Sequence, residues 1–204
     1  MKQMKRKLLL GVFLFVTASL LLIAAAASRQ ASVSGKLIRL HILADCDTET
    51  AQADKLAVRD TVLDLLERQS WQSREEAASW LRAHTQELED AARDCLTGRG
   101  CADPVSVRLV RERYPTRHYD TFSLPAGEYL SLQVRIGSAE GQNWWCVIYP
   151  DLCLPAAQDA LLTAAVSAGF TDEDFRFITA DTGEIQIKFK VLEWLDALRG
   201  SEHR

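Results

Sequence analysis

Residues 37–44 have the sequence Leu-Ile-Arg-Leu-His-Ile-Leu-Ala, and this run sets the pattern from which the fold class is predicted. Apolar side chains occupy alternate positions, with Arg39 and His41 between them. Because successive side chains of a strand point to opposite faces, the run predicts a β-strand with one apolar and one polar face. A polar turn follows, and apolar residues at helical spacing then predict a helix that ends near Arg68.

A second helix has signals at both of its ends. Ser73 and Glu76 have the spacing of a capping box, in which a hydroxyl and a carboxylate bond to backbone N–H groups of the first turn. Apolar residues at helical spacing continue to Cys95, and Gly98 is of the type that ends helices. The pattern therefore predicts one helix from about residue 74 to Gly98.

Beyond Pro104 the period of the apolar residues changes towards two. This change predicts strands over residues 105–111, 129–136 and 144–149. The segment 137–143 is rich in turn residues, so the last two strands are predicted to form a hairpin.

The C-terminal part predicts an Ala/Leu-rich helix over residues 155–168 and a final hairpin of residues 175–179 and 184–191. The second of these strands could instead run into a C-terminal helix. Helices and strands are grouped more than they alternate, which is typical of an α+β fold. We therefore expect one exported α+β domain over residues 37–199, with a mainly antiparallel sheet and three to four helices. A polar tail follows over residues 200–204.

The N-terminal segment predicts export. A basic run at residues 2–7 precedes twenty uncharged residues at 8–27, and small residues end the segment. This is the pattern of a signal peptide cut after Ala26 or Ala27. Twenty apolar residues also just span a bilayer, so an uncleaved anchor is the alternative. In both cases the body is expected outside the cytoplasm, after a short linker at residues 28–36.

The charge is unevenly distributed. Of 24 basic residues, four lie in the first 27 residues, where there is no acidic residue. The remaining 177 residues hold 20 basic and 28 acidic residues, a net charge of −8. Such a body would be repelled by phosphate backbones, so nucleic-acid binding is not expected. The composition, with 48% apolar and 25% charged residues, excludes a disordered or multi-span membrane chain.

Export allows the five cysteines to form disulfides. Cys95 and Cys101 are separated by a glycine-rich turn, and Cys146 and Cys153 by a Tyr-Pro reversal, so each pair is a disulfide candidate. Buried free thiols are the alternative for both pairs, and Cys46 is left over. The spacings are not those of a metal site, so neither a metal nor another cofactor is expected.

His41 lies five residues before Cys46, which raises the possibility of a Cys/His nucleophile pair. The spacing does not require the two side chains to meet, and a structural histidine on a strand face is the simpler interpretation. No Gly-x-Ser-x-Gly, His-Glu-x-x-His or P-loop motif occurs in the sequence. From the residues, no class of enzyme is favoured.

Two further groups are candidates for contacts with a partner protein. Lys55 and Arg59 are four residues apart and share one face of the first predicted helix, where they could bind a carboxylate or remain solvated. Trp144 and Trp145 are large aromatic side chains that fill a core or serve as a binding hot spot.

Several blocks of the sequence occur in order over about residues 38–195, which is nearly the whole exported body. They are IRLHILADCD (38–47), KLAVRD (55–60), YPTRHY (114–119), LPAGEY (124–129), NWWCVIYPDLC (143–153) and IKFKV (187–191). Together they resemble the stage II sporulation protein R family of endospore-forming bacteria. The Trp-Trp-Cys block and the first strand-helix block are the most specific.

The resemblance implies an intercellular signalling protein that is not itself an enzyme. It would be exported from the forespore into the space between the forespore and mother-cell membranes. There it would activate the membrane-embedded aspartic protease that processes the sigma-E precursor, by contact with the protease's extracytoplasmic domain. An exported hydrolase and a cell-envelope binding module are the alternatives.

The resemblance assigns no catalytic residues. The candidate contacts are therefore taken from the polar and aromatic residues of the matching blocks: Arg39, His41, Asp47, Lys55, Arg59, Asp60, Trp144 and Trp145. Two positions depart from the family pattern, which often has serine in place of Cys46 and Pro-Pro in place of Pro150-Asp151. The first departure argues against catalysis by Cys46.

Overall fold

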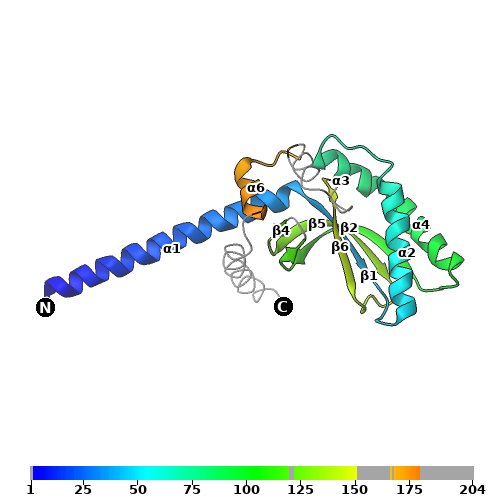
Figure 1. Ribbon diagram of the computed structural model, residues 1–204, viewed down its shortest axis with the longest axis horizontal. Helices are drawn as coiled ribbons and strands as arrows, with labels where there is room; N and C mark the ends of the chain where they lie inside the picture. The colour runs from blue at the N-terminus through cyan, green and yellow to red at the C-terminus, as the bar shows by residue number, and fades with distance from the viewer. Residues whose placement is uncertain (1, 120–121, 151–165, 167, 180–204) are drawn as a thin grey trace. The chain divides into compact units, whose positions relative to one another are not determined.

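The computed structural model describes residues 2–119, 122–150, 166 and 168–179, whose helices and strands are shown in Figure 1. The chain forms two compact units, where the sequence predicts one domain over residues 37–199. The smaller unit comprises residues 1–33, 114–127 and 172–204, and the larger unit comprises residues 34–113 and 128–171. Residues 114–127, which connect two strands of the larger unit, belong to the smaller unit.

The described part of the larger unit contains a four-stranded sheet and three helices. Its elements are β1 (Ile38–Leu43), α2 (Glu49–Leu66), α3 (Arg74–Ala83), α4 (Thr85–Gly98), β2 (Val105–Tyr114), β5 (Gly127–Ile136) and β6 (Asn143–Tyr149). The strands are ordered β2-β5-β1-β6 across the sheet. This arrangement confirms the predicted α+β class.

Strand β1 lies inside the sheet, between β5 and β6. It pairs in parallel with β5, where Leu40 is opposite Leu132, and antiparallel with β6, where Leu40 is opposite Cys146. The predicted hairpin of β5 and β6 is therefore wrong, because β1 separates the two strands. Alternation of apolar residues identifies a strand, but it does not identify the neighbours of that strand.

The connection from β5 to β6 crosses the end of β1 and is held there by hydrogen bonds. The Asp45 carboxylate accepts the backbone N–H of Ser138 at 2.7 Å, and the Asp47 carboxylate accepts that of Gln142 at 2.7 Å. The N–H of Gly141 donates at 3.0 Å to the carbonyl of the residue before Asp45. The bond from Ser138 also holds the pKa of Asp45 below its usual range. These bonds explain why a turn-rich segment spans a strand instead of closing a hairpin.

Helices α2, α3 and α4 cover one face of the sheet (Figure 1). The apolar positions Ile38, Leu40 and Ile42 of β1 are fully buried against them, as the alternating sequence predicts. Each large aliphatic side chain that is buried in this way contributes about 1.5–3 kcal/mol to folding. The core therefore determines which face of β1 turns towards the helices.

The predicted continuous helix over residues 74–98 is two helices, α3 and α4, which meet at His84. The His84 ring stacks on Trp80 with ring centroids 4.1 Å apart, and its Nδ1 lies 2.8 Å from the Trp80 carbonyl oxygen. His84 has φ −111° and ψ 14°, outside helical values. A side chain that bonds to the preceding turn competes with helix continuation, which accounts for the break. The predicted end at Gly98 is confirmed.

Capping by Ser73 is confirmed, and it gives a first testable prediction. The Ser73 hydroxyl accepts the Glu76 N–H at 3.1 Å, while the Glu76 carboxylate accepts the Gln72 N–H at 2.8 Å. Replacing Ser73 by alanine is expected to lower the free energy of unfolding by about 1 kcal/mol, because an N–H of the first turn loses its acceptor. Urea titration of the variant measures the loss. Ser70→Ala, at an exposed position outside the helices, is the control, and an equal loss there would contradict the capping role.

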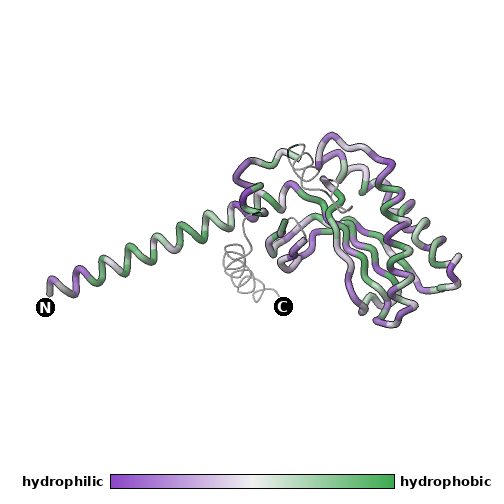
Figure 2. The backbone as a smooth tube through the Cα atoms, in the orientation of Figure 1, coloured by the Kyte–Doolittle hydropathy of each residue, from purple (hydrophilic) through white to green (hydrophobic). Residues whose placement is uncertain are grey.

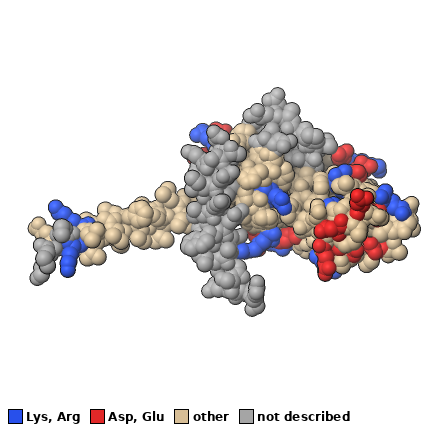
Figure 3. Space-filling model, turned by 60° about the horizontal axis from the view of Figure 1, so that its bottom comes forward, with Lys and Arg blue, Asp and Glu red and all other residues tan. Residues whose placement is uncertain are grey.

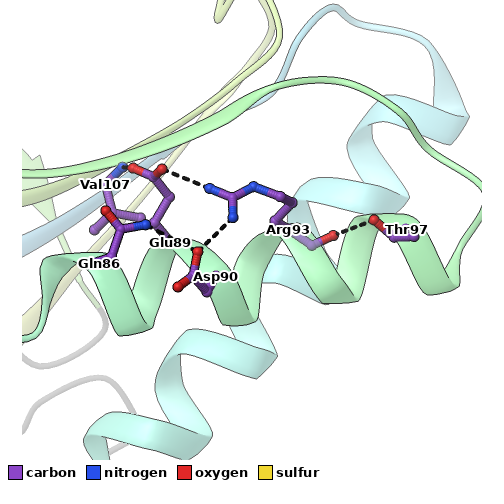
Figure 4. A network of polar contacts seen from close by, with 6 residues as sticks. All are labelled: Gln86, Glu89, Asp90, Arg93, Thr97 and Val107. Atoms are coloured by element: carbon purple, nitrogen blue, oxygen red, sulfur yellow. Dashed lines mark hydrogen bonds and ion pairs between the residues drawn. The ribbon is translucent and has the colours of Figure 1, made fainter.

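A polar network also joins α4 to the outer strand β2 (Figure 4). The Glu89 carboxylate accepts the Val107 N–H at 3.1 Å and lies 2.8 Å from Nη2 of Arg93, which also binds Asp90 at 2.5 Å. An edge strand leaves backbone donors available on its outer side, and here a side chain satisfies one of them. Between α2 and α4, Asp54 is buried and lies 2.6 Å from Nε of Arg99.

Helix α1 (Lys2–Lys36) contains the predicted signal or anchor segment. Its residues 5–36 are long and apolar enough to cross a membrane, which is true of no other helix in the described part of the chain. Figure 2 shows the hydrophobic run of α1, and Figure 3 shows Lys and Arg side chains near its N-terminal end. The helix is thus compatible with a signal peptide or a membrane anchor.

The predicted linker at residues 28–36 is wrong, because these residues continue α1. Their polar side chains bind within the smaller unit. Gln30 donates to the Ala126 carbonyl, and the Ser32 hydroxyl donates to Asp174 at 3.0 Å. A polar composition suggested a tether, but tertiary hydrogen bonds hold this segment in helical form.

The remaining elements of the smaller unit are β3 (Arg117–His118), β4 (Ser123–Leu124) and α6 (Asp172–Thr179). The strand predicted over residues 175–179 is wrong, since this segment is part of α6. Three acidic residues in the first turn stabilise the N-terminus of this helix, and Asp174 and Ile178 are buried at helical spacing. The strand predicted over 184–191 and the tail over 200–204 lie outside the described residues, as does most of the helix predicted over 155–168.

Candidate functional site

The alternation of β1 places Arg39 and His41 on the face of the sheet opposite to α2, α3 and α4. Neighbouring strands bring further polar groups to this face, because Gln133 of β5 and Trp145 of β6 both lie beside His41. The resulting cluster, here named the polar face, consists of Arg39, His41, Glu112, Tyr129, Ser131, Gln133, Asn143 and Trp145.

His41 lies at the centre of the polar face. Its Nδ1 is 3.0 Å from Glu112 Oε2, and its Nε2 is 3.0 Å from Asn143 Oδ1. The imidazole ring also lies against Trp145, with ring centroids 5.3 Å apart. Both ring nitrogens therefore lie within hydrogen-bonding distance of a side-chain oxygen atom.

Glu112 connects the outer strand β2 with the middle of the sheet. Its Oε2 accepts a hydrogen bond from Gln133 Nε2 at 2.8 Å in addition to its contact with His41. Burial acts to raise the pKa of Glu112, but hydrogen bonds from His41, Ser131 and Gln133 outweigh it and hold the pKa below its usual range. The carboxylate is therefore ionised at neutral pH, and it is a partly buried acceptor among several donors.

Arg39 lies further along the polar face. Its guanidinium carbon is 5.1 Å from the centre of the Tyr129 ring, and both side chains are fully buried. A cation above an aromatic ring is stabilised by the ring electrons. Arg39, predicted as a partner contact, is thus fully buried against Tyr129 in the structure.

The structure does not bring His41 and Cys46 together as a nucleophile pair. A His/Cys nucleophile pair needs the thiol within hydrogen-bonding reach of a ring nitrogen. In the structure both nitrogens of His41 are occupied by Glu112 and Asn143, while the Cys46 thiol lies 3.4 Å from the Thr48 hydroxyl. His41 thus fits the predicted structural role better than that of a general base.

Lys55 and Asp47, also predicted as contacts, support the β5–β6 connection. Lys55 is 6% exposed, and its Nζ donates to Gln52 Oε1 at 2.5 Å and to the Gln142 carbonyl at 3.1 Å. Desolvation lowers the pKa of Lys55. The structure thus places Lys55 against the β5–β6 connection, which the sequence could not foresee because it does not show which loop covers the helix.

Arg59, Asp60 and Trp144 form a separate group on the helix side of the sheet. The Arg59 guanidinium lies 2.7 Å from the Asp60 carboxylate, and its central carbon lies 5.4 Å from the Trp144 ring centre. Trp144 is half-buried against the core. The eight predicted contact residues therefore fall into three groups: Arg39, His41 and Trp145 on the polar face, Asp47 and Lys55 at the β5–β6 connection, and Arg59, Asp60 and Trp144 on the helix side of the sheet.

Comparison with known proteins identifies the family. The family model described as Stage II sporulation protein R (spore_II_R) matches residues 34–159. A similar protein, Stage II sporulation protein R of Bacillus subtilis (strain 168), is 31% identical over 162 residues, which cover 74% of this chain and 71% of that protein. The chain belongs to the stage II sporulation protein R family. No solved structure matches the chain.

The part of the chain that matches the stage II sporulation protein R model contains the whole polar face. Three of its central residues, Glu112, Gln133 and Asn143, were not among the predicted contacts. Gln133 lies within the predicted strand 129–136, while Glu112 and Asn143 directly adjoin the predicted strands 105–111 and 144–149, so alternation extended by one residue was a signal that could have found them. The missing information was the order of the strands, which brings the three residues to His41.

The structure bears on one of the two cysteine pairs that were predicted as disulfide candidates. Cys95 and Cys101 are free thiols, so the bridge proposed between them is absent from the structure. Cys101 has other partners in the turn after α4. Its backbone N–H donates to the Leu96 carbonyl, and the Cys101 thiol lies 3.4 Å from the Asp103 carboxylate. Cys146 is buried on β6, and Cys153 lies outside the described residues, so that pair stays a prediction.

Within the described ranges, no group of three or more His, Cys, Asp and Glu side chains is arranged to hold a metal ion.

Proposed function

We propose that this member of the stage II sporulation protein R family is an exported signalling protein that activates the membrane-embedded protease processing the sigma-E precursor in the mother cell. The observation that carries the proposal is its family membership, with a match that extends over residues 34–159. The basic end and apolar run of α1 are consistent with delivery of the body across a membrane.

Activation by binding requires that the protein bind the active form of the protease more tightly than the inactive form. A preference of about 100-fold would shift this equilibrium by about 2.7 kcal/mol. The partner surface is the extracytoplasmic domain of the protease, the part that an exported protein can reach. We propose that the contact lies at the end of the polar face that includes the exposed Asn143, because Arg39, Tyr129 and Ser131 of the same face are fully buried.

The proposal predicts that three components are sufficient for processing. In a non-sporulating host, the sigma-E precursor is expected to be cleaved when this chain and the protease are produced together, and an immunoblot for the shortened precursor measures the outcome. Omission of either the chain or the protease is the control. If the precursor stays intact although the chain is folded and exported, the activator role is wrong, and the alternatives of a hydrolase and an envelope-binding module gain support.

A further inference from the structure

Two exposed arginines lie at one end of the polar face. Arg135 is opposite Leu43 in the register of β5 with β1, two residues beyond Gln133, and so belongs to this face. Arg108 lies four residues before Glu112 on β2, and positions an even number apart on a strand share a face. Both arginines are exposed, in contrast to Arg39.

The pairing of β2 with β5 brings these two arginines together. The Gly137 N–H at the end of β5 donates to the Pro104 carbonyl before β2 at 2.8 Å, while Arg111 of β2 reaches Glu128 near the start of β5. The two strands therefore run antiparallel. Counting from the Gly137 bond places Arg108 opposite Gln133 and diagonal to Arg135, a separation at which long side chains interact.

The charges at this end of the face are uncompensated within the described chain. Arg59, Arg93, Arg99 and Arg111 each have a carboxylate partner, whereas no ion pair among the described residues includes Arg108 or Arg135. Like charges that are neighbours in a sheet repel each other. They stand out on a body whose charge after the first 27 residues is −8. The arrangement is therefore complementary to an external anion.

We propose that Arg108 and Arg135 bind an acidic segment in the extracytoplasmic domain of the activated protease, an inference that rests on the proposed function. Arginine offers a planar set of donors that binds carboxylates in a bidentate geometry, so two adjacent arginines recognise two carboxylates of an acidic segment. Their position beside Gln133 and Asn143 adds uncharged hydrogen-bonding groups to the same end of the face.

The test uses the full chain in the three-component processing experiment. Arg108→Glu is expected to reduce processing by about tenfold or more, because the new carboxylate pairs with Arg135 and repels an acidic partner. This variant is expected to unfold at the same or a higher urea concentration than the wild type, since it replaces repulsion by attraction. The matched control is Arg68→Glu, an exposed charge reversal outside the polar face, which is expected to retain normal processing.

Two further variants complete the test. The double variant Arg108→Lys and Arg135→Lys keeps the charge but loses the bidentate geometry, so it is expected to support less processing than the wild type and more than Arg108→Glu. Protease variants in which one acidic residue of the extracytoplasmic domain is replaced by lysine are then combined with Arg108→Glu. At least one of them is expected to restore processing. Normal processing with Arg108→Glu would overturn the inference, and so would a search that yields no restoring change. In either case the activator role would stand as long as the wild type supports processing. Absence of processing with the wild type would instead refute the proposed function, and the inference with it.

Discussion

Replacing Gly141 by alanine is expected to lower the free energy of unfolding by about 1–3 kcal/mol, the range for forcing extra atoms into a packed site. A Cβ atom at this position would collide with the backbone carbonyl of Cys46 and would touch the side chain of Ala44. Backbone atoms cannot rotate away as a side chain does. The connection from β5 to β6 must therefore move away from the end of β1, which breaks the Gly141–Ala44 hydrogen bond.

The matched control is Gly98→Ala. Gly98 ends α4, and a Cβ atom there would meet nothing within 4 Å. Alanine is favoured over glycine in a helix by about 0.5–1 kcal/mol, so this variant is expected to be as stable as the wild type or slightly more stable. Urea titrations of both variants provide the comparison. A Gly141→Ala chain with the stability of the wild type would show that the crossing is not as tightly packed as the structure indicates.

Replacing Glu112 by glutamine is expected to have the second large effect, a loss of about 1–3 kcal/mol at pH 7. The carboxylate accepts hydrogen bonds from Gln133 and Ser131 and faces His41, and an amide cannot serve as an ionised acceptor for all of them. The variant therefore leaves polar groups of a partly buried cluster with weaker partners.

The same variant tests the pH dependence of the cluster. The pKa of Glu112 is lower in the folded protein than its ordinary value, so the unfolded chain binds the proton more readily. The ionised Glu112 carboxylate therefore stabilises the folded state. This stabilisation is fully present above the pKa of Glu112 in the unfolded chain and is lost as the pH falls through its pKa in the folded protein. Wild-type stability is thus expected to decline on acidification below about pH 5, and Glu112→Gln should decline less steeply.

Glu128→Gln is the control for this effect. Glu128 is an exposed glutamate on the neighbouring strand β5, 3.4 Å from Arg111. An exposed ion pair of this kind contributes about 0–1 kcal/mol. Free energies of unfolding at pH 7, 5 and 4 separate the two sites. Parallel pH profiles for wild type and Glu112→Gln would contradict the role of the ionised carboxylate.

The sequence by itself determined the local elements of this protein. Alternation in residues 37–44 identified β1 and its apolar face, Ser73 identified the start of α3, and Gly98 identified the end of α4. These features depend on neighbouring residues of the chain. The apolar N-terminal segment and the family resemblance were also visible in the sequence, since both depend on the order of residues.

Tertiary structure alone decided which elements and side chains meet. Sheet order inserts β1 between β5 and β6, and hydrogen bonds to Asp45 and Asp47 hold the connection across the end of β1. The same order brings Glu112 of β2 to His41 of β1 across β5. Burial of Lys55 depends on a loop almost ninety residues further along the chain. Local pattern cannot specify such contacts, because strand pairing and loop packing are set by the free energy of the whole folded unit.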